Sequence, residues 1–487
     1  MGSESATRKA AIVGGGISGL AAALELHERD PAVSVTLYEG GDRPGGVLQT
    51  EQEKNFLFEL GPDSILRRLP WGMQLCERVG LGEQMIPTEP AAAGVYTVYR
   101  GRLARMPEGL ALFAPQKIWP IVRTPILSWR GKLRMAAERF LPARRSNDDE
   151  SLAQFARRRF GQEALQRIIQ PLAGGIYMGD PELLGMQASF PQLVAAEREC
   201  GSLIKWHRQA AAKAAKGTDG PKETLFTAPQ HGFSQLVDAI VKRLPAGTLR
   251  LNHRVEQLTR GERDWRVQGV QSLSGQPFDD RFDWVVLATP AAQTASLIAD
   301  TDATLAGLLR SIPHTSCVVI NLAYPMTAIG RPLDASGIIV PHVERRALAA
   351  CTFSSVKYRG RAPQGMALLR VFLGGAHQPH AIDAPDVELL ESVRRELRAL
   401  LRIEGEPVFE QLVRWRDTMP QYLVGHWELV NEIESRVAQW AGLELIGNAY
   451  RGVGIPYCIH YAQQSVNRLF SADQGRTFAA VPETSRS

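Results

Sequence analysis

The sequence predicts an α/β protein: a discontinuous Rossmann-like domain, a second domain on a mixed sheet, and a helical region. Three observations predict this fold class. A glycine-rich loop near residue 14 joins a short apolar strand to a helix, an apolar strand ending in small residues lies at 283–290, and another strand ends in Gly-Asn at 443–448. The length of 487 residues suffices for two or three domains.

The composition is ordinary for a globular protein, with 44% hydrophobic and 22% charged residues. No apolar run is long enough to predict a transmembrane helix, and the N-terminus does not resemble a secretory signal. Five dispersed cysteines without Cys-x-x-Cys pairs predict reduced thiols and a cytoplasmic protein. The histidine spacing predicts no metal site, and the net charge of +5 is too mild to predict a nucleic-acid partner.

The positive charge is concentrated in one segment. Eleven of the 56 Lys and Arg residues, but only two of the 51 acidic residues, lie between Arg100 and Arg145. The segment also carries apolar and aromatic residues, namely Phe113, Trp119, Ile121, Ile126, Leu127, Trp129 and Phe140. This mixture is typical of contact with a membrane surface or an acidic amphiphilic ligand. A solvated helical hairpin that packs its apolar side on the core explains it equally well.

Residues 8–39 form one strand–loop–helix–strand unit. A buried strand is predicted at 10–13, a helix at 20–29 and a β-branched, alternating strand at 33–38. The loop between the first strand and the helix has the pattern G-x-G-x-x-G, and an acidic residue follows the second strand. This context is specific for a dinucleotide site, whereas the glycine pattern alone is weak.

Each residue of the loop has a physical task. Gly14 permits the tight turn, Gly16 lets the backbone approach a pyrophosphate, and Gly19 lets the helix pack closely on the strand. The helix start, with the N–H groups of Ile17 and Ser18, offers a positive dipole end to phosphates. Glu39 is expected to accept hydrogen bonds from ribose hydroxyls, which disfavours NADP.

The next segments favour FAD over NAD. Arg43, Gly45 and Gly46 stand just beyond the acidic residue, and this loop resembles the second fingerprint of amine-oxidase-like flavoproteins, which continues along the FAD pyrophosphate. A Gly-Pro-x-Ser step of the same superfamily follows at 61–64. Further cofactor contacts implied by this resemblance are Gly61, Pro62, Asp63, Ser64, Val255, Ala288, Gly447, Asn448, Val453, Gly454 and Ile455. A helix predicted at 458–470 is expected to point its N-terminus at the flavin.

Five motifs together resemble the oxygen-dependent protoporphyrinogen and coproporphyrinogen oxidases. They lie at 171–181, 188–191, 371–376, 420–426 and 446–459, and the resemblance extends over nearly the whole chain. It implies FAD-dependent oxidation of a porphyrinogen, with O₂ as acceptor and H₂O₂ as product, in haem biosynthesis. The sequence leaves open whether the substrate is protoporphyrinogen IX or coproporphyrinogen III.

The resemblance also implies site residues. Gly174 and Gly175 are expected beside the flavin, where a backbone carbonyl orients the substrate, and no side-chain base is expected. Arg100 and Arg102 are candidates for the substrate carboxylates. Apolar walls of the pocket are expected at Ile338, Ile339, Phe353 and Phe372.

The predicted domains are an FAD-binding domain (1–90, 225–295 and 435–487), a helical region (91–224) and a substrate-binding domain (296–434). The helical region is expected to contact a membrane, on its inner face, through residues 91–220. A monomer or a homodimer is expected, and the next enzyme of the haem pathway is a candidate partner. Two alternatives remain: another flavoenzyme of the superfamily (an amine oxidase or a carotenoid desaturase), or a tetrapyrrole-binding protein without turnover.

Overall fold

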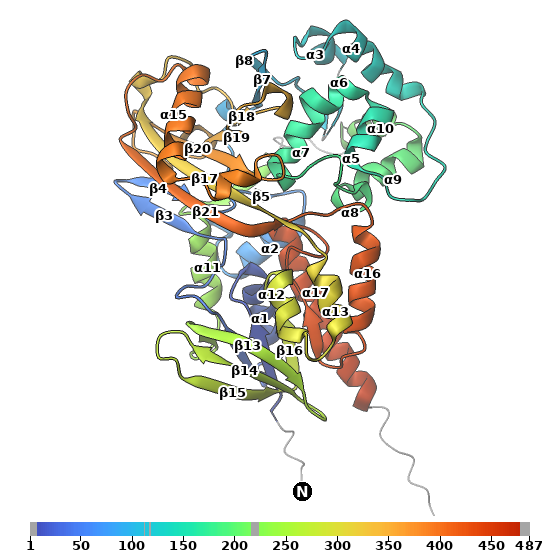
Figure 1. Cartoon of the computed structure of the whole chain (residues 1–487), viewed down its shortest axis with the longest axis vertical. Helices are drawn as coiled ribbons and strands as arrows, with labels where there is room; N and C mark the ends of the chain where they lie inside the picture. Colours follow the sequence, from blue (N-terminus) through green and yellow to red (C-terminus); the bar gives the residue numbers. More distant parts are fainter. Residues whose placement is uncertain (1–6, 112, 116–117, 216–223, 478–487) are drawn as a thin grey trace, which may run out of the picture.

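A computed structural model describes residues 7–111, 113–115, 118–215 and 224–477. The outer parts of the predicted FAD-binding domain, 1–6 and 478–487, lie outside the described residues, as do 112, 116–117 and 216–223 of the predicted helical region. Figure 1 shows β16 (Trp284–Leu287), a strand of a five-stranded sheet, together with α1 (Ile17–Arg29), α12 (Ala291–Ile298) and α17 (Ile455–Thr477) at the end of the molecule near the N-terminus. A second large sheet and a mainly helical region lie side by side at the other end.

The five-stranded sheet is parallel and is assembled from distant parts of the chain, which confirms the predicted fold class. Its strand order is β12-β2-β1-β16-β22. The strands are β1 (Lys9–Val13), β2 (Ser34–Tyr38), β12 (Leu249–Arg250), β16 (Trp284–Leu287) and β22 (Leu443–Leu445). The central strands β1 and β16 are apolar because helices or a second sheet cover both faces.

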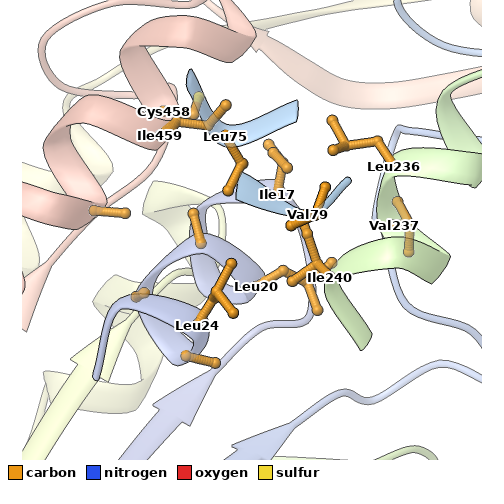
Figure 2. Packing of buried hydrophobic residues seen from close by; sticks show 14 of the residues in the cluster. Ile17, Leu20, Leu24, Leu75, Val79, Leu236, Val237, Ile240, Cys458 and Ile459 are labelled. Carbon is orange, nitrogen blue, oxygen red and sulfur yellow. The ribbon is translucent and has the colours of Figure 1, made fainter. Parts of the chain in front are cut away.

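One face of this sheet is covered by four helices, α1 (Ile17–Arg29), α2 (Pro70–Arg78), α11 (Phe233–Val241) and α17 (Ile455–Thr477). Figure 2 shows how Leu20, Ile240 and Ile459 bring three of them together. The helices α1 and α17 each begin three residues earlier than predicted, at Ile17 and Ile455. Glycine loops precede both, so the first helical turn has no apolar periodicity to reveal it.

The other face packs against a three-stranded sheet and three helices. They are β13 (His253–Arg260), β14 (Trp265–Gln271), β15 (Pro277–Phe282), α12 (Ala291–Ile298), α13 (Ala303–Arg310) and α16 (His426–Val437). Residues 50–87 and 226–229 add small sheets: β3 (Thr50–Glu53), β4 (Phe56–Glu59), β5 (Ile65–Leu66), β6 (Met85–Pro87) and β11 (Phe226–Pro229).

The mixed sheet has seven strands in the order β21-β17-β20-β19-β18-β7-β8. They are β7 (Tyr96–Tyr99), β8 (Arg102–Arg105), β17 (His314–Pro325), β18 (Gly337–Ile339), β19 (Ala350–Phe353), β20 (Met366–Gly374) and β21 (Phe409–Pro420). One face packs on α15 (Asp386–Leu401). The predicted helical region therefore begins with two strands of this sheet, because β7 pairs in parallel with β18.

The helical region has its own apolar core. Its helices are α3 (Ile118–Arg123), α4 (Trp129–Ala136), α5 (Leu152–Arg159), α6 (Gln162–Ala164), α7 (Gln170–Tyr177), α8 (Met186–Ser189), α9 (Pro191–Cys200) and α10 (Leu203–Ala215). A 3-10 turn, η3 (Ala137–Phe140), and a π-helical turn, η4 (Leu165–Ile169), join them. None of the helices in the described part of the chain has the length and apolar character of a membrane span.

Short elements complete the chain. They are β9 (Leu110–Ala111), β10 (Ala114–Pro115), α14 (Ser354–Lys357), η1 (Gly82–Gln84), η2 (Pro90–Ala92), η5 (Met326–Ala328), η6 (His342–Glu344) and η7 (Pro379–Ile382). Two of these elements carry residues that are described below. The helix α14 follows β19 and ends at Lys357, and η6 follows β18 and ends at Glu344.

Candidate active site

Two glycines of the loop after β1 are fixed by close backbone contacts. Gly14 has φ +109°, and a Cβ there would lie 2.8 Å from the carbonyl oxygen of Ala288. A Cβ on Gly19 would lie 2.0 Å from the carbonyl oxygen of Gly14. The turn is therefore tight and the first turn of α1 lies directly on it, as the pattern predicts. Ala288, at the end of β16, donates its N–H to Val13 at 2.8 Å and so borders the same loop.

Gly16 leaves a bare cradle at the start of α1. A Cβ built there has no protein atom within 4 Å, and no side chain caps the helix. The N–H groups of the first turn, which includes Ile17 and Ser18, thus have no capping side chain to compete with a ligand. Gly46 lies across the cradle, since its Cβ would be 3.3 Å from Gly16 Cα, and Gly45 donates to Gly15 at 2.8 Å. This cradle fits the pyrophosphate of FAD.

Glu39 organises the ribose side of the loop. Its carboxylate accepts the N–H groups of Gly15 at 2.7 Å and Gly41 at 2.8 Å, so it joins the two glycine loops. The guanidinium of Arg43 donates to the carbonyls of Gly46 at 2.7 Å and Pro44 at 3.2 Å. Arg43 thus shapes the second loop while keeping its positive charge beside the cradle.

The start of β13 is hydrogen-bonded to the segment that follows β2. Asn252 donates its N–H to Gly41 and His253 donates to Glu39, each at 2.8 Å. Val255 follows two residues later, buried at 9% exposure. The structure therefore places Val255 close to the two glycine loops, and its contact with the adenine stays a prediction.

The C-terminal motif approaches from the opposite direction. Gly447 has φ +140° after β22, and Asn448 accepts the hydroxyl hydrogen of Tyr422 at 2.6 Å on its carbonyl oxygen. Val453 packs against the core of the helical region, whereas Ile455 packs against α1. The carbonyl of Gly454 accepts the N–H groups of Tyr457 and Cys458 as α17 begins. The loop 447–455 is thus the junction between the five-stranded sheet, the helical region and α17.

The segment 61–64 lies between these two ends of the predicted cofactor site. A Cβ on Gly61 would lie 1.7 Å from the carbonyl oxygen of Val47, directly after the second glycine loop. At its other end, Ile65 contacts Gly72, which also lies against Pro456 at the start of α17. Pro62, Asp63 and Ser64 therefore occupy the path from the pyrophosphate cradle to α17. Sequence reasoning missed the partners of Asp63, namely Lys357 and Arg370, because no local pattern joins residues so far apart.

Helix α7 carries Gly174 and Gly175. The carbonyl of Gly174 accepts the N–H of Met178 at 2.9 Å and closes the helix end. One lone pair of the Gly174 carbonyl is therefore used within the helix, and the predicted contact with the substrate has only the second lone pair. Gly175 is exposed, and a Cβ there has no neighbour within 4 Å. The two glycines leave this side of α7 without side chains, which is the property a flat ligand needs.

The end of α7 is anchored to the mixed sheet. The carbonyl of Met178 accepts the N–H of Ala376 at 2.8 Å, just after β20, and the carbonyl of Tyr177 accepts the amide of Gln421 at 2.9 Å, just after β21. The motifs at 171–181, 371–376 and 420–426 therefore meet at one place. They come from three distant parts of the chain.

The strand pairing corrects two of the predicted pocket walls. Ile338 and Phe353 are 1% and 0% exposed in the core beside α15. Phe372 pairs with Ala350, which also pairs with Ile339, so these three side chains share the opposite face of the sheet. Ile339, the fourth predicted wall residue, packs towards the helical region. Ile338 and Ile339 point to different sides because neighbouring residues of a strand face opposite sides.

Arg100 and Arg102 lie at the tip of the β7–β8 hairpin with exposed side chains. The carboxylate of Glu344 accepts the N–H groups of Arg100 and Gly101 at 3.0 Å each and also pairs with Arg167. Although burial opposes it, these hydrogen bonds and Arg167 hold the pKa of Glu344 below its usual value. The hairpin tip is thus held against the helical region, and the side chains of Arg100 and Arg102 remain exposed.

A parallel sheet with a bare phosphate cradle, a second glycine loop and a C-terminal helix meeting the same site defines an FAD-binding flavoprotein. The family model described as flavin containing amine oxidoreductase matches residues 17–469. The chain belongs to this family.

Individual relatives agree with this. A coproporphyrinogen III oxidase from Propionibacterium freudenreichii subsp. freudenreichii is 34% identical, over 97% of this chain and 92% of that protein. One from Bacillus subtilis (strain 168) is 31% identical, over 94% and 96%. A crystal structure of a protein from Exiguobacterium sp. 255-15 has a TM-score of 0.83 at 27% identity, and the match covers 95% of this chain and 99% of that one.

Proposed function

We propose that this protein oxidises coproporphyrinogen III to coproporphyrin III with bound FAD and O₂, and releases H₂O₂, as a step of haem biosynthesis. The observation that carries the proposal is the near full-length similarity to two proteins named coproporphyrinogen III oxidase, together with an intact FAD cradle. Coproporphyrinogen III is preferred over protoporphyrinogen IX because three relatives at 30% identity or more carry the name of the tetracarboxylate substrate.

The reaction removes six electrons from the macrocycle in three two-electron steps, and bound FAD supplies the two-electron chemistry and passes the electrons to O₂. The chain's own residues position the reactants. The start of α17 directs a positive dipole end towards the flavin site. The side of α7 that lacks side chains at Gly174 and Gly175 admits a flat ring. Ile339 and Phe372 supply an apolar surface, and Arg100 and Arg102 stand at the rim for carboxylates.

The decisive experiment is aerobic turnover of the yellow, purified protein on coproporphyrinogen III and protoporphyrinogen IX, followed by porphyrin fluorescence and peroxide. We expect about three peroxides per porphyrin, as the electron count requires, and a higher kcat/KM for coproporphyrinogen III. A higher kcat/KM for protoporphyrinogen IX contradicts the substrate. Flavin-loaded protein that is inert towards both overturns the proposal and favours an amine or polyene substrate, or binding without turnover.

A second proposal concerns α3, α4 and η3, which we propose contact an anionic membrane surface. Four of their apolar side chains are exposed: Trp119 (71%), Trp129 (67%), Leu133 (69%) and Phe140 (83%). Other apolar residues of the same segment, such as Ile126 and Met135, are fully buried. Packing on the core therefore accounts for only part of the apolar pattern. The exposed bases Arg123, Arg130 and Arg139 supply the electrostatic attraction that complements apolar contact.

Sedimentation with lipid vesicles tests this surface. Wild-type protein is expected to bind vesicles that contain phosphatidylserine more strongly than vesicles of phosphatidylcholine alone, and salt should weaken the binding. Trp129→Ser combined with Phe140→Ser should abolish it. Leu273→Ser is the matched control, because Leu273 is 84% exposed in a turn of the three-stranded sheet. Equal binding by the double variant and the control contradicts the proposal.

A further inference from the structure

Asp63 of segment 61–64 belongs to a largely buried group of charges that the reaction scheme above does not use. Lys357, the last residue of α14, donates to both carboxylate oxygens of Asp63, at 3.0 and 2.9 Å, and to the hydroxyl of Ser64 at 2.8 Å. Arg370 of β20 donates to the carbonyl of Gly61 and lies 3.7 Å from the carboxylate of Asp63. Two cations from different elements thus meet one carboxylate at the centre of the cofactor path.

The neighbouring charges do not balance this excess. Arg361 lies 4.0 Å from Glu59, whose carboxyl balances this third cation only when it is ionised. The hydroxyl of Tyr358 contacts Ser64 at 2.8 Å, and burial raises the pKa of Tyr358, which keeps it neutral. With Asp63 ionised, Lys357 and Arg370 leave one positive charge in excess. Although burial alone would raise it, the charges of Lys357 and Arg370 hold the pKa of Asp63 well below its usual range.

The excess charge is poorly screened by water. The exposed fractions of the side chains are 12% for Lys357, 4% for Arg370 and 20% for Asp63. The Nε atom of Arg370 is buried and has no hydrogen-bond partner among the described residues, while its guanidinium stacks 4.6 Å from the ring centre of Phe372. A charge in such surroundings acts over a longer distance than one at the surface.

The position of the excess charge indicates the group on which it acts. Gly61 packs against the carbonyl of Val47, directly after the second glycine loop. At the other end of the segment, Ile65 packs against Gly72, which in turn lies against Pro456 at the start of α17. Asp63 and Ser64 lie between these two points. A cofactor that extends from the cradle at Gly16 to α17 has its flavin end beside them. Phe372, on the substrate face of the mixed sheet, adjoins the same guanidinium.

We propose that Lys357 and Arg370 stabilise the negative charge that the bound flavin gains on reduction, and that Asp63 sets the size of this effect by neutralising one of the two cations. The inference rests on bound FAD, not on the identity of the porphyrinogen. It makes Lys357 a residue that tunes the reduction potential from outside the recognised glycine motifs. The sign of each charge predicts the sign of its effect.

Anaerobic redox titration of the FAD-loaded protein with a reference dye tests this without any porphyrinogen. Lys357→Met should lower the two-electron reduction potential, with about a tenfold loss in the equilibrium constant for reduction, which is about 30 mV. Asp63→Asn keeps the shape and removes the opposing charge, so it should raise the potential. Arg359→Met is the matched control, because Arg359 lies two residues from Lys357 with 84% of its side chain exposed.

Opposite shifts of the reduction potential in the two variants, with no shift in the control, support the inference. If these residues had a purely structural role, the direction of any shift would not depend on the sign of the charge that is removed. Unchanged potentials in both variants overturn it, and so do shifts in the same direction. If Lys357→Met does not retain FAD, Asp63→Asn still decides the question, since an unchanged or lowered potential contradicts the inference. Inertness of the wild type towards porphyrinogens would overturn the proposed function but would leave these potentials measurable.

Discussion

Single backbone positions decide whether the loop after β1 can hold a phosphate. Gly14 and Gly19 are excluded from bearing a side chain by protein atoms, whereas Gly16 is surrounded by open space. The first two glycines therefore serve the fold, and Gly16 serves the ligand. Glu59 shows a second residue-scale effect, because it is an ionisable group buried at a junction of β4, β3 and α11.

Gly16→Val separates folding from cofactor binding. Gly16 has φ −69° and ψ 177°, which valine adopts easily, and no protein atom opposes its Cβ. We expect a folded, colourless protein with FAD loading reduced at least about tenfold, since the side chain occupies the pyrophosphate position. Absorbance of purified protein and its melting temperature without FAD measure both effects. Gly307→Ala, also in open space, should remain yellow, and a yellow Gly16→Val would refute the cradle.

Glu59 should give the stability a specific pH dependence. Burial raises the pKa of its carboxyl to about 7 from 4.5, against the opposing hydrogen bond from Thr50. The protonated form is thus favoured in the folded state. This stabilising contribution is fully present below pH 4.5 and is lost as the pH rises to 7, by about 3 kcal/mol.

The test compares wild type with Glu59→Gln in urea at pH 5 and pH 7. Glutamine is neutral at both pH values and can still accept the N–H of Phe233. We expect the variant to gain stability relative to wild type as the pH rises through this window. A constant difference between the two proteins would show that Glu59 does not titrate there.

At the scale of elements, a buried ion pair holds the helical region together. Arg159, the last residue of α5, pairs with Glu138 of η3, and both side chains are 0% exposed. The carboxylate of Glu138 also accepts the N–H groups of Leu203 and Ile204 at the start of α10. One carboxylate thus caps one helix and ties another to the turn after α4.

Arg159→Met should therefore cost about 3 to 5 kcal/mol, because it leaves a buried carboxylate without its cation. Arg157→Met, two residues earlier, removes a pair with Glu182 in which both side chains are 40% or more exposed, and it should cost at most about 1 kcal/mol. Urea midpoints of the two variants provide the measurement. Similar midpoints would mean that the hydrogen bonds from Leu203 and Ile204 are sufficient to stabilise the buried carboxylate of Glu138 without Arg159.

At the scale of the whole molecule, the cofactor joins the ends of the chain. The cradle comes from residues 14–46 and the proposed flavin end from 447–455, while Lys357 belongs to α14 and Arg370 to β20. Since these parts are distant in sequence, we expect FAD to act as a shared contact among them.

Removal of FAD should lower the melting temperature of the whole protein. FAD at about 100 times its Kd should restore about 2.7 kcal/mol, and the melting temperature should rise with FAD concentration. Scanning calorimetry across a series of FAD concentrations measures this. NAD serves as the control, because the second glycine loop and the 447–455 motif favour FAD. Equal stabilisation by NAD would contradict the cofactor assignment.

The sequence predicts the local parts of this protein well. The strands at 10–13 and 33–38 and the loop at Gly14, Gly16 and Gly19 are confirmed, since hydrophobic alternation and glycine spacing act over a few residues. It fails at β7 and β8, which it placed among helices, and it could not separate Ile338, which packs in the core beside α15, from Ile339 on the opposite face. Strand pairing determines both, and pairing involves residues more than 200 positions apart.

By itself, then, the sequence determined the class of fold, the cofactor and the family of reaction, because each rests on short motifs whose chemistry is local. Tertiary structure alone decided which faces of the mixed sheet line the site, that the carbonyl of Gly174 is used by its helix, and that Asp63 meets Lys357 and Arg370. Those contacts depend on how strands pair and helices pack across the chain. No pattern within a single segment carries that information.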